Sequence, residues 1–223
     1  MTEKDSTEPY VIQIQRKVVK FDQAQIDKLR IEFRSSHCVR LTHLLEPSLL
    51  DSLLERIENG QWQTMTHPDI GEEYVLDDRP ALNLLHFLTN VPKFRDLIES
   101  ITSQGPLRRF RGRVYRMIAG KGHHDRWHDD ATESWLAGMT LNLSSKAFHG
   151  GLFMLREAQS GRVLSEIANM GLGDALVFRI TPELEHRISD LEGETPKTAF
   201  AGWFASNDLE LIEELRQKSR PQA

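Results

Sequence analysis

The chain has 223 residues, a formal net charge of −5 at pH 7, and hydrophobic and charged fractions of 39% and 27%. This length suits one domain with a substantial core, and the acidic balance excludes a general affinity for nucleic acid or anionic membranes. The single cysteine, Cys38, excludes an internal disulfide and a cysteine-based zinc cluster. The polar start is unlike a signal peptide, and no apolar run approaches the ~18 residues of a membrane span. We therefore expect a soluble, cytoplasmic protein with no membrane partner.

The region 9–107 follows a short start, residues 1–8, that we expect to be disordered. Its alternating segments 10–21 and 38–45 predict strands. Apolar residues recur at helical spacing in 22–33, 46–59, 80–90 and 91–102. The polar segment 66–81 could serve as a lid over a site or as a plain connection, and nothing local decides between them. We expect 9–107 to be an α/β support region integral to the fold.

The pattern changes in the region 108–205, which is rich in short β patterns separated by turn residues. Strands are predicted at 109–118, 135–144, 151–157, 162–169, 174–180, 185–192 and 198–206. Short strands at this spacing are typical of a sandwich or barrel of the jelly-roll type. The end of the chain, 206–223, predicts a closing helix and a tail. The fold class is therefore α+β with a mainly β core.

The segment "HHDRWHDD", 123–130, is the candidate metal site. It contains two His-x-Asp triplets, which begin at His123 and His128. In an extended segment residues i and i+2 point to the same face, so both side chains of a triplet can bind one ion. A third ligand could come from His186, in the strand predicted at 185–192. Two imidazoles and one carboxylate form the facial triad of non-haem Fe(II) oxygenases.

Several further features follow the cluster in a fixed order. They are Trp127 before His128, the glycine pair 150–151, the segment Gly-Asp-Ala-Leu-Val-Phe at 173–178, Lys197 eleven residues after His186, and Trp203. In this order they resemble the 2-oxoglutarate/Fe(II)-dependent dioxygenases, specifically the prolyl-4-hydroxylase-like branch. The resemblance covers about residues 108–205. It rests on the ordered set and not on any single motif.

The resemblance implies a double-stranded β-helix with the N-terminal helices packed on its sheet. It implies that Fe(II), 2-oxoglutarate and O2 are used, with ascorbate as a further candidate, and that an unactivated C–H bond is hydroxylated with release of succinate and CO2. His128, Asp130 and His186 match the metal ligands, and Gly120 and Trp127 favour this register over the triplet at His123. Lys197 matches the basic residue that pairs with the C5 carboxylate of 2-oxoglutarate.

The remaining co-substrate site departs from the family pattern. Asn142 stands where many members have tyrosine, Thr140 shares its strand face, and Tyr115 is the nearest remaining tyrosine. We expect these three residues to contribute to 2-oxoglutarate binding. Weaker candidates for positions around the metal or the substrate are His124, Trp127, Arg116 and Trp203.

Three matters stay open at this point. The five arginines in 108–116 could attract an anionic substrate or simply form a solvated strand face, and Trp203 stands where nucleic-acid dealkylating relatives need arginine. The substrate could be a prolyl residue in a peptide, an amino acid or a small natural product. The competing hypotheses are a cupin-like metalloprotein with non-oxidative chemistry and a catalytically silent binding or sensor barrel; Lys197 argues against the first, and the intact triad argues against the second.

Overall fold

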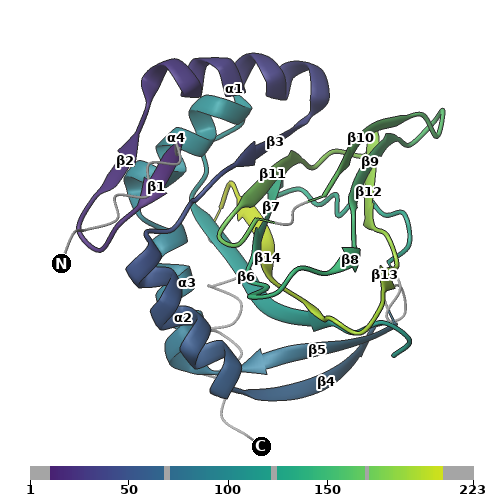
Figure 1. Ribbon diagram of the computed structural model, residues 1–223. Coiled ribbons are helices and arrows are strands. Elements are labelled where there is room, and N and C mark those ends of the chain that lie inside the picture. Colours follow the sequence, from purple (N-terminus) through teal and green to yellow (C-terminus); the bar gives the residue numbers. More distant parts are fainter. Residues whose placement is uncertain (1–10, 68–70, 122–124, 169–170, 208–223) are drawn as a thin grey trace, which may run out of the picture.

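The computed structural model describes residues 11–67, 71–121, 125–168 and 171–207. The start expected to be disordered, 1–8, and the part of the closing segment from 208 onwards lie outside these ranges. The described residues form two facing β-sheets and a layer of helices, which Figure 1 shows on one side of the larger sheet. This is the α+β architecture with a mainly β core that the sequence predicts.

The larger sheet is antiparallel and has seven strands in the described residues. Its central strands come from the β-rich region 108–205, and one edge is extended by a hairpin from the first half of the chain. In spatial order the strands are β3 (Cys38–Leu41), β11 (Ala175–Arg179), β7 (Trp135–Asn142), β14 (Lys197–Ala205), β6 (Arg109–Met117), β5 (Gly71–Asp77) and β4 (Gln61–His67).

The smaller sheet faces the concave side of the larger one and closes the barrel (Figure 1). It consists of β10 (Val163–Ile167), β9 (Phe153–Glu157) and β12 (Leu184–Ile188), and an isolated bridge joins His128 to the free edge of β12. Two short antiparallel pairs complete the strands: β8 (His149–Gly150) with β13 (Leu191–Glu192), and β1 (Ile12–Ile14) with β2 (Val19–Phe21).

The helices pack on the outer face of the larger sheet through apolar stripes. They are α1 (Gln23–Ser36), α2 (Pro47–Asn59), α3 (Arg79–Thr89) and α4 (Pro92–Thr102). Asp22 and Asp78 accept hydrogen bonds from the first free backbone N–H groups of α1 and α3, and proline occupies the first turns of α2, α3 and α4. Phe94 of α4 is fully buried against Phe204 of β14, with ring centroids 6.3 Å apart.

Most predicted elements are present, and three segments differ from the prediction. The predicted single strand 10–21 is a hairpin, β1 and β2, because the polar stretch between the strands forms the turn. The described residues of the segment 66–81, which exclude 68–70, form the end of β4, β5 and the start of α3. Its strand character is hidden because β4 is a largely exposed edge strand without the alternation of a half-buried one. The predicted strand 185–192 is divided between β12 and β13.

Candidate metal centre

His128 and His186 lie directly opposite each other across an antiparallel bridge. The N–H of His128 donates to the carbonyl of His186 at 3.1 Å, and the reverse bond measures 2.8 Å. Side chains of such a pair project from the same face of the sheet. The two imidazole centroids are accordingly 4.3 Å apart. Residues 58 positions apart in the chain thus present two nitrogen ligands to one place.

Asp130 completes the group from two residues beyond His128. Its Oδ2 lies 3.3 Å from His186 Nε2, and its Oδ1 lies 3.7 Å from His128 Nε2. One ligand atom from each of the three residues falls within 4.8 Å of the others. The φ of Asp130 is +53°, in the left-handed region that aspartate tolerates better than most residues. The local chain bend therefore turns the carboxylate toward the two imidazoles.

The donor atoms of the triad suit a metal ion. His128 Nδ1 donates to the carbonyl of Arg126 at 2.7 Å, which leaves Nε2 of His128 free to act as the ligand. Burial alone would raise the pKa of Asp130, but the hydrogen bond and charge interaction with His186, together with the hydrogen bond from Trp203, outweigh burial and lower that pKa. Two imidazoles and a carboxylate are a donor set that non-haem Fe(II) accepts. The residues present therefore fit the metal that the resemblance implies.

Aromatic packing fixes the orientation of the buried His186 ring. The ring of Phe178 lies 4.6 Å from it and that of Phe153 lies 6.0 Å from it, centroid to centroid. Phe178 in turn lies over Gly138 of β7, where an added Cβ would come within 2.1 Å of the Phe178 ring. A glycine at 138 is therefore required for this packing.

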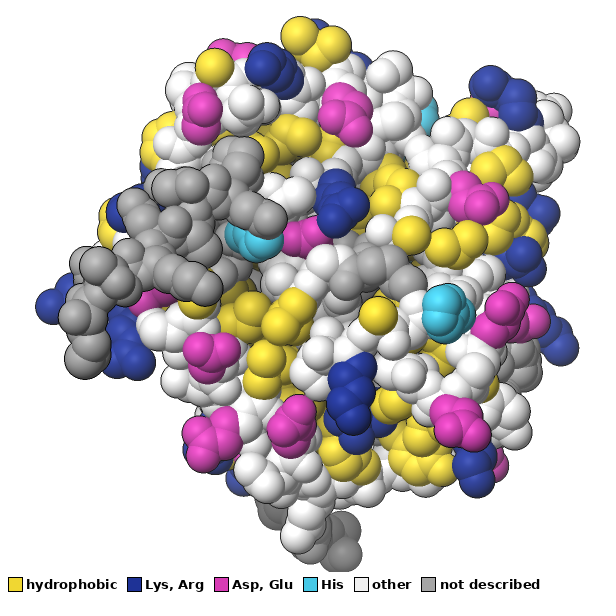
Figure 2. All heavy atoms as spheres, in the orientation of Figure 1, with side chains coloured by type: hydrophobic (Ala, Val, Ile, Leu, Met, Phe, Trp, Pro, Cys, Tyr) yellow, Lys and Arg dark blue, Asp and Glu magenta, His cyan; other side chains and the backbone are white. Residues whose placement is uncertain are grey.

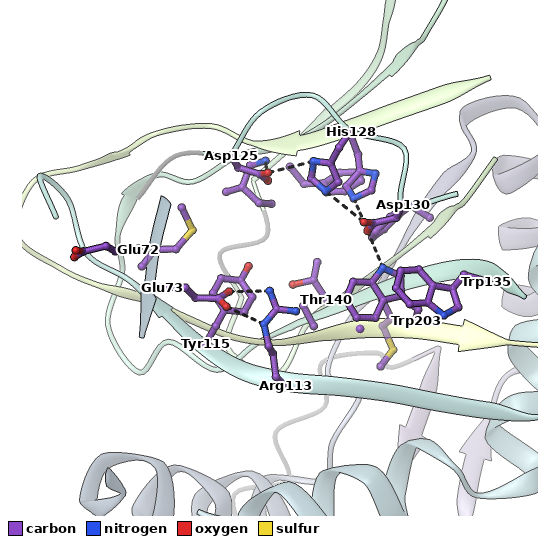
Figure 3. Close-up of a pocket in the computed structure, with 18 residues that line it drawn as sticks. Glu72, Glu73, Arg113, Tyr115, Asp125, His128, Asp130, Trp135, Thr140 and Trp203 are labelled. Carbon is purple, nitrogen blue, oxygen red and sulfur yellow. Dashed lines mark hydrogen bonds and ion pairs between the residues drawn. The ribbon is translucent and has the colours of Figure 1, made fainter. Parts of the chain in front are cut away.

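A cavity of about 430 Å³ opens beside the triad. Figure 3 shows its upper wall, with Asp125, His128 and Asp130, facing a lower wall from the large sheet. The lower wall and the two ends are formed by side chains of β5, β6, β7 and β14: Glu72, Glu73, Arg113, Tyr115, Trp135, Thr140 and Trp203. The volume lies toward the low end of the roughly 300–1,000 Å³ of small-molecule sites.

Trp203 connects the barrel-facing side of β14 to the triad. Its Nε1–H donates to Asp130 Oδ2 at 2.7 Å, and its ring stacks on Trp135 with centroids 4.2 Å apart and an interplanar angle of 12°. The stack holds the indole in place, and the hydrogen bond occupies one carboxylate oxygen of Asp130. Trp203, a weak candidate from sequence, thus contacts a triad residue directly.

Lys197 is the first residue of β14 and lies on the same face as Trp203, six residues later, because side chains on a strand alternate. It is 3% exposed, and its Nζ donates to the carbonyl of Gly151 at 2.7 Å. Among the described residues it forms no ion pair with a carboxylate, and it does not line the cavity. Burial lowers the pKa of Lys197 to about 8. It is a desolvated cation without a direct counter-ion in this part of the chain.

The other expected co-substrate residues divide into two groups. Tyr115 and Thr140 both line the cavity, and their hydroxyls interact with each other, while burial raises the pKa of Tyr115. Asn142 does not line it: its Nδ2 donates to the carbonyl of Gly171, and its Oδ1 accepts from the N–H of Ser144. Asn142 therefore ties the end of β7 to Gly171 and Ser144.

The arginine-rich segment 108–116 is divided between the two faces of β6. Arg113 lines the cavity, whereas Arg116 lies on the opposite face, donates to Thr198 Oγ1 at 3.0 Å and stacks 4.1 Å from the centroid of Trp62. On the molecular face in Figure 2, lysine and arginine side chains are scattered among acidic ones. The division of Arg113 and Arg116 between the two faces means that the five arginines do not form one patch.

The remaining candidates lie around the ligand segment. Trp127 does not line the cavity; the guanidinium groups of Arg156 and Arg187 lie 4.2 Å and 5.0 Å from its ring centroid. The competing candidate Asp125 accepts from the N–H of Ile188 at 2.6 Å and is not part of the triad. His123 and His124 lie outside the described residues.

From the sequence, Arg113 is only one of five arginines that could attract an anion, and Glu73 is not a candidate. They form an ion pair in which Arg113 Nε and Nη2 donate to Glu73 at 2.8 Å and 3.1 Å. Arg113 is two residues from Tyr115, so strand alternation could have placed it on the same face. For Glu73 no comparable signal exists, because the strand that carries it was not recognised.

Comparisons with known proteins give structural matches only. No protein-family model and no curated protein matches the chain. A 2OG-Fe(II) oxygenase family oxidoreductase from Burkholderia pseudomallei matches with a TM-score of 0.62 and 15% identity, over 84% of this chain and 94% of that one. A Pseudomonas putida prolyl-4-hydroxylase matches with a TM-score of 0.61 and 16% identity, over 82% and 100%. The epimerase SnoN from nogalamycin biosynthesis, described as non-haem and α-ketoglutarate dependent, gives 0.62 and 12%, over 83% and 84%.

At these identities the likeness defines the fold. The chain has the double-stranded β-helix fold of the 2-oxoglutarate/Fe(II) oxygenases, prolyl-4-hydroxylases included, as the sequence predicts. Within that fold it carries a His-Asp-His triad whose geometry is consistent with a facial iron site. No helix in the described ranges has the length and apolarity needed to cross a membrane.

Proposed function

We propose that this protein is a 2-oxoglutarate- and Fe(II)-dependent oxygenase that hydroxylates an unactivated C–H bond of a small molecule or peptide. The observation that carries the proposal is the convergence of His128, Asp130 and His186 at the wall of a cavity in this fold. When bound, iron, 2-oxoglutarate and O2 together supply the oxidising chemistry, and succinate and CO2 are released.

The triad residues would hold Fe(II) through the Nε2 atoms of both histidines and a carboxylate oxygen of Asp130. The contacts of His128 with the carbonyl of Arg126 and of Asp130 with Trp203 orient two of the ligands before any metal binds. Trp127 supports the same segment through its cation–π contacts with Arg156 and Arg187. The chain's own contribution is thus a preoriented set of ligands at the wall of the cavity.

Lys197 would bind the C5 carboxylate of 2-oxoglutarate. A buried ammonium whose direct contact is a backbone carbonyl gains a counter-ion when a carboxylate arrives, and the pKa of Lys197 then rises from about 8. Tyr115 and Thr140 offer hydroxyl groups from the same side of the large sheet. Asn142 and Arg116 would act indirectly, since neither lines the cavity.

The first experiment is an anaerobic titration of metal-free protein with Fe(II) and then 2-oxoglutarate. We expect the weak visible charge-transfer band of an Fe(II)–2-oxoglutarate chelate in wild type and its loss in His186→Ala. The exposed His149 provides a matched control, and His149→Ala should keep the band. A folded wild-type protein that gives no band would contradict the proposal.

The reaction type needs a second measurement, because the same fold occurs in an epimerase. Mass spectrometry of a turned-over substrate should show the addition of one oxygen atom. A product of unchanged mass and inverted configuration would replace hydroxylation by epimerisation while leaving the metal centre intact. The cytoplasmic location stays a prediction, which imaging of the tagged chain in cells would test.

A further inference from the structure

Arg113 is a second cation on the concave side of the large sheet, well separated from Lys197. In the register of β6 and β14, Arg113 pairs with Ala201, whereas Lys197 pairs with Met117. The two positions are four residues apart along the strands, or about 13 Å at ~3.3 Å per residue. Arg113 lines the cavity and Lys197 lies beyond it. The barrel therefore offers two distinct positions for an anion.

Glu73 fixes the orientation of the Arg113 guanidinium. Its side chain is only 7% exposed, and its two oxygens accept from Nε and Nη2 of Arg113. Burying the Glu73 carboxylate costs much of what its attraction to the partly exposed Arg113 returns, so the pair contributes little net stability. The position of the pair in a cavity wall is better explained by the N–H groups that the oriented Arg113 guanidinium directs into the cavity.

The guanidinium still has donors to offer. It carries five N–H groups, and Nη1 donates to none of the described residues. Figure 3 shows the nitrogen that does not face Glu73 on the side toward Thr140 and Trp203. Among the described residues that line the cavity, Arg113 is the only lysine or arginine, beside the carboxylates of Glu72, Glu73, Asp125 and Asp130.

We propose that the substrate of this oxygenase carries a carboxylate and that Arg113, held by Glu73, binds it. The proposal rests on the proposed function, in which Lys197 binds the C5 carboxylate of 2-oxoglutarate and leaves Arg113 for the second reactant. A carboxylate accepts from the Nη edge of a guanidinium through two parallel hydrogen bonds, which fixes its orientation as well as its position. A cavity of about 430 Å³ that also admits the co-substrate selects a small carboxylic acid.

The test compares acids with matched amides. The probes are free L-amino acids and unbranched, branched and cyclic carboxylic acids of four to eight carbons, each paired with its primary amide. Binding to metal-free protein is followed by ligand-observed NMR saturation transfer, which does not depend on turnover. We expect at least one acid to bind tenfold or more tightly than its amide, because the amide removes the charge and keeps the shape.

Two variants assign that preference to the pair. Arg113→Gln should abolish the difference between acid and amide, and Glu73→Gln should weaken acid binding severalfold by releasing the guanidinium. Arg108→Gln, in the same arginine-rich segment but with an exposed side chain, is the matched control and should behave as wild type. The charge-transfer titration of Arg113→Gln should be unchanged, which also shows that the variant is folded.

Several outcomes would overturn the proposal: no acid binding, equal binding of acids and amides, or an acid preference that survives in Arg113→Gln. A tenfold higher requirement for 2-oxoglutarate in Arg113→Gln would instead place the co-substrate at this residue. If acids bind through Arg113 but wild type gives no charge-transfer band, the anion site stands and the oxygenase function fails. The two proposals can therefore fail separately.

Discussion

The two faces of strand β14 have opposite compositions. Toward the helices it presents Phe200 and Phe204, both fully buried in the main apolar cluster. Toward the barrel it presents Lys197, two alanines (199 and 201) and Trp203. Alanines on the barrel face leave room for the cavity, while phenylalanines on the other face fill space. One strand thus serves as scaffold on one side and as binding site on the other.

This difference indicates where the stability comes from. Burying a phenylalanine side chain contributes about 1.5–3 kcal/mol, whereas a desolvated ammonium such as that of Lys197 opposes folding. The helix-covered face therefore has to offset the cost of the polar groups held inside the barrel. Substitutions on the two faces should separate the free energy of unfolding from the binding of metal and co-substrate.

The largest expected effect on stability comes from the helix-covered face. Phe204→Ala should lower the free energy of unfolding by about 3–5 kcal/mol, because the side chain is fully buried between Phe94 and Phe110. Chemical denaturation measures the loss. Phe204→Leu should lose clearly less, and the exposed Phe87→Ala should change stability by less than about 0.5 kcal/mol.

The folded fraction of Phe204→Ala should still give the charge-transfer band at low temperature. A band lost from protein that remains folded would mean that the two faces of β14 are not independent.

On the barrel face, Lys197→Met should weaken 2-oxoglutarate binding without lowering stability. We expect the concentration of 2-oxoglutarate needed for half of the band to rise about 10- to 100-fold, since a hydrogen bond to a charged group contributes about 1.5–3 kcal/mol. The free energy of unfolding at pH 7 should increase, because a buried charge is removed. Lys146→Met, at an exposed position, is the control and should change neither quantity.

A fall in stability of Lys197→Met without any change in 2-oxoglutarate requirement would contradict the role assigned to Lys197. The residue would then be a structural contact to Gly151.

The sequence specified the apolar face and the His-Asp-His triad better than it specified the cavity. Helical spacing and capping residues located the helices because these signals are local. The His-x-Asp triplet and the distant His186 located the triad because they occur in the order that the resemblance implies. The hairpin of β4 and β5 was missed because an exposed edge strand needs no apolar alternation. With it, the Glu73–Arg113 pair was missed, since this pair depends on which strand lies beside β6.

The pH dependence of stability and of 2-oxoglutarate binding gives a smaller test of the role of Lys197. Without co-substrate, the pKa of Lys197 is about 8, against ~10.4 in an unfolded chain. Between these values the unfolded state binds more protons, so the free energy of unfolding should rise with pH from about 8 to about 10. Binding of 2-oxoglutarate needs the ammonium, so its affinity should fall about tenfold per pH unit above about 8.

Denaturation and band titrations across pH 7–10 measure both slopes. Lys197→Met should remove this contribution from each of them. Slopes that persist unchanged in the variant would assign the titration to another group.

The smallest effect should come from the hydrogen bond between Trp203 on the barrel face and Asp130 of the triad. Trp203→Phe keeps a ring against Trp135 but removes the N–H donated to Asp130 Oδ2. We expect Fe(II) affinity to fall about fivefold, equivalent to about 1 kcal/mol, and the charge-transfer band to shift because Asp130 becomes a stronger donor. Trp135→Phe alters the same stack but leaves the bond to Asp130, so it should not shift the band. Equal changes in both variants would mean that Trp203 acts through packing alone, and that the barrel face of β14 contributes space to the metal centre but no direct control of its ligands.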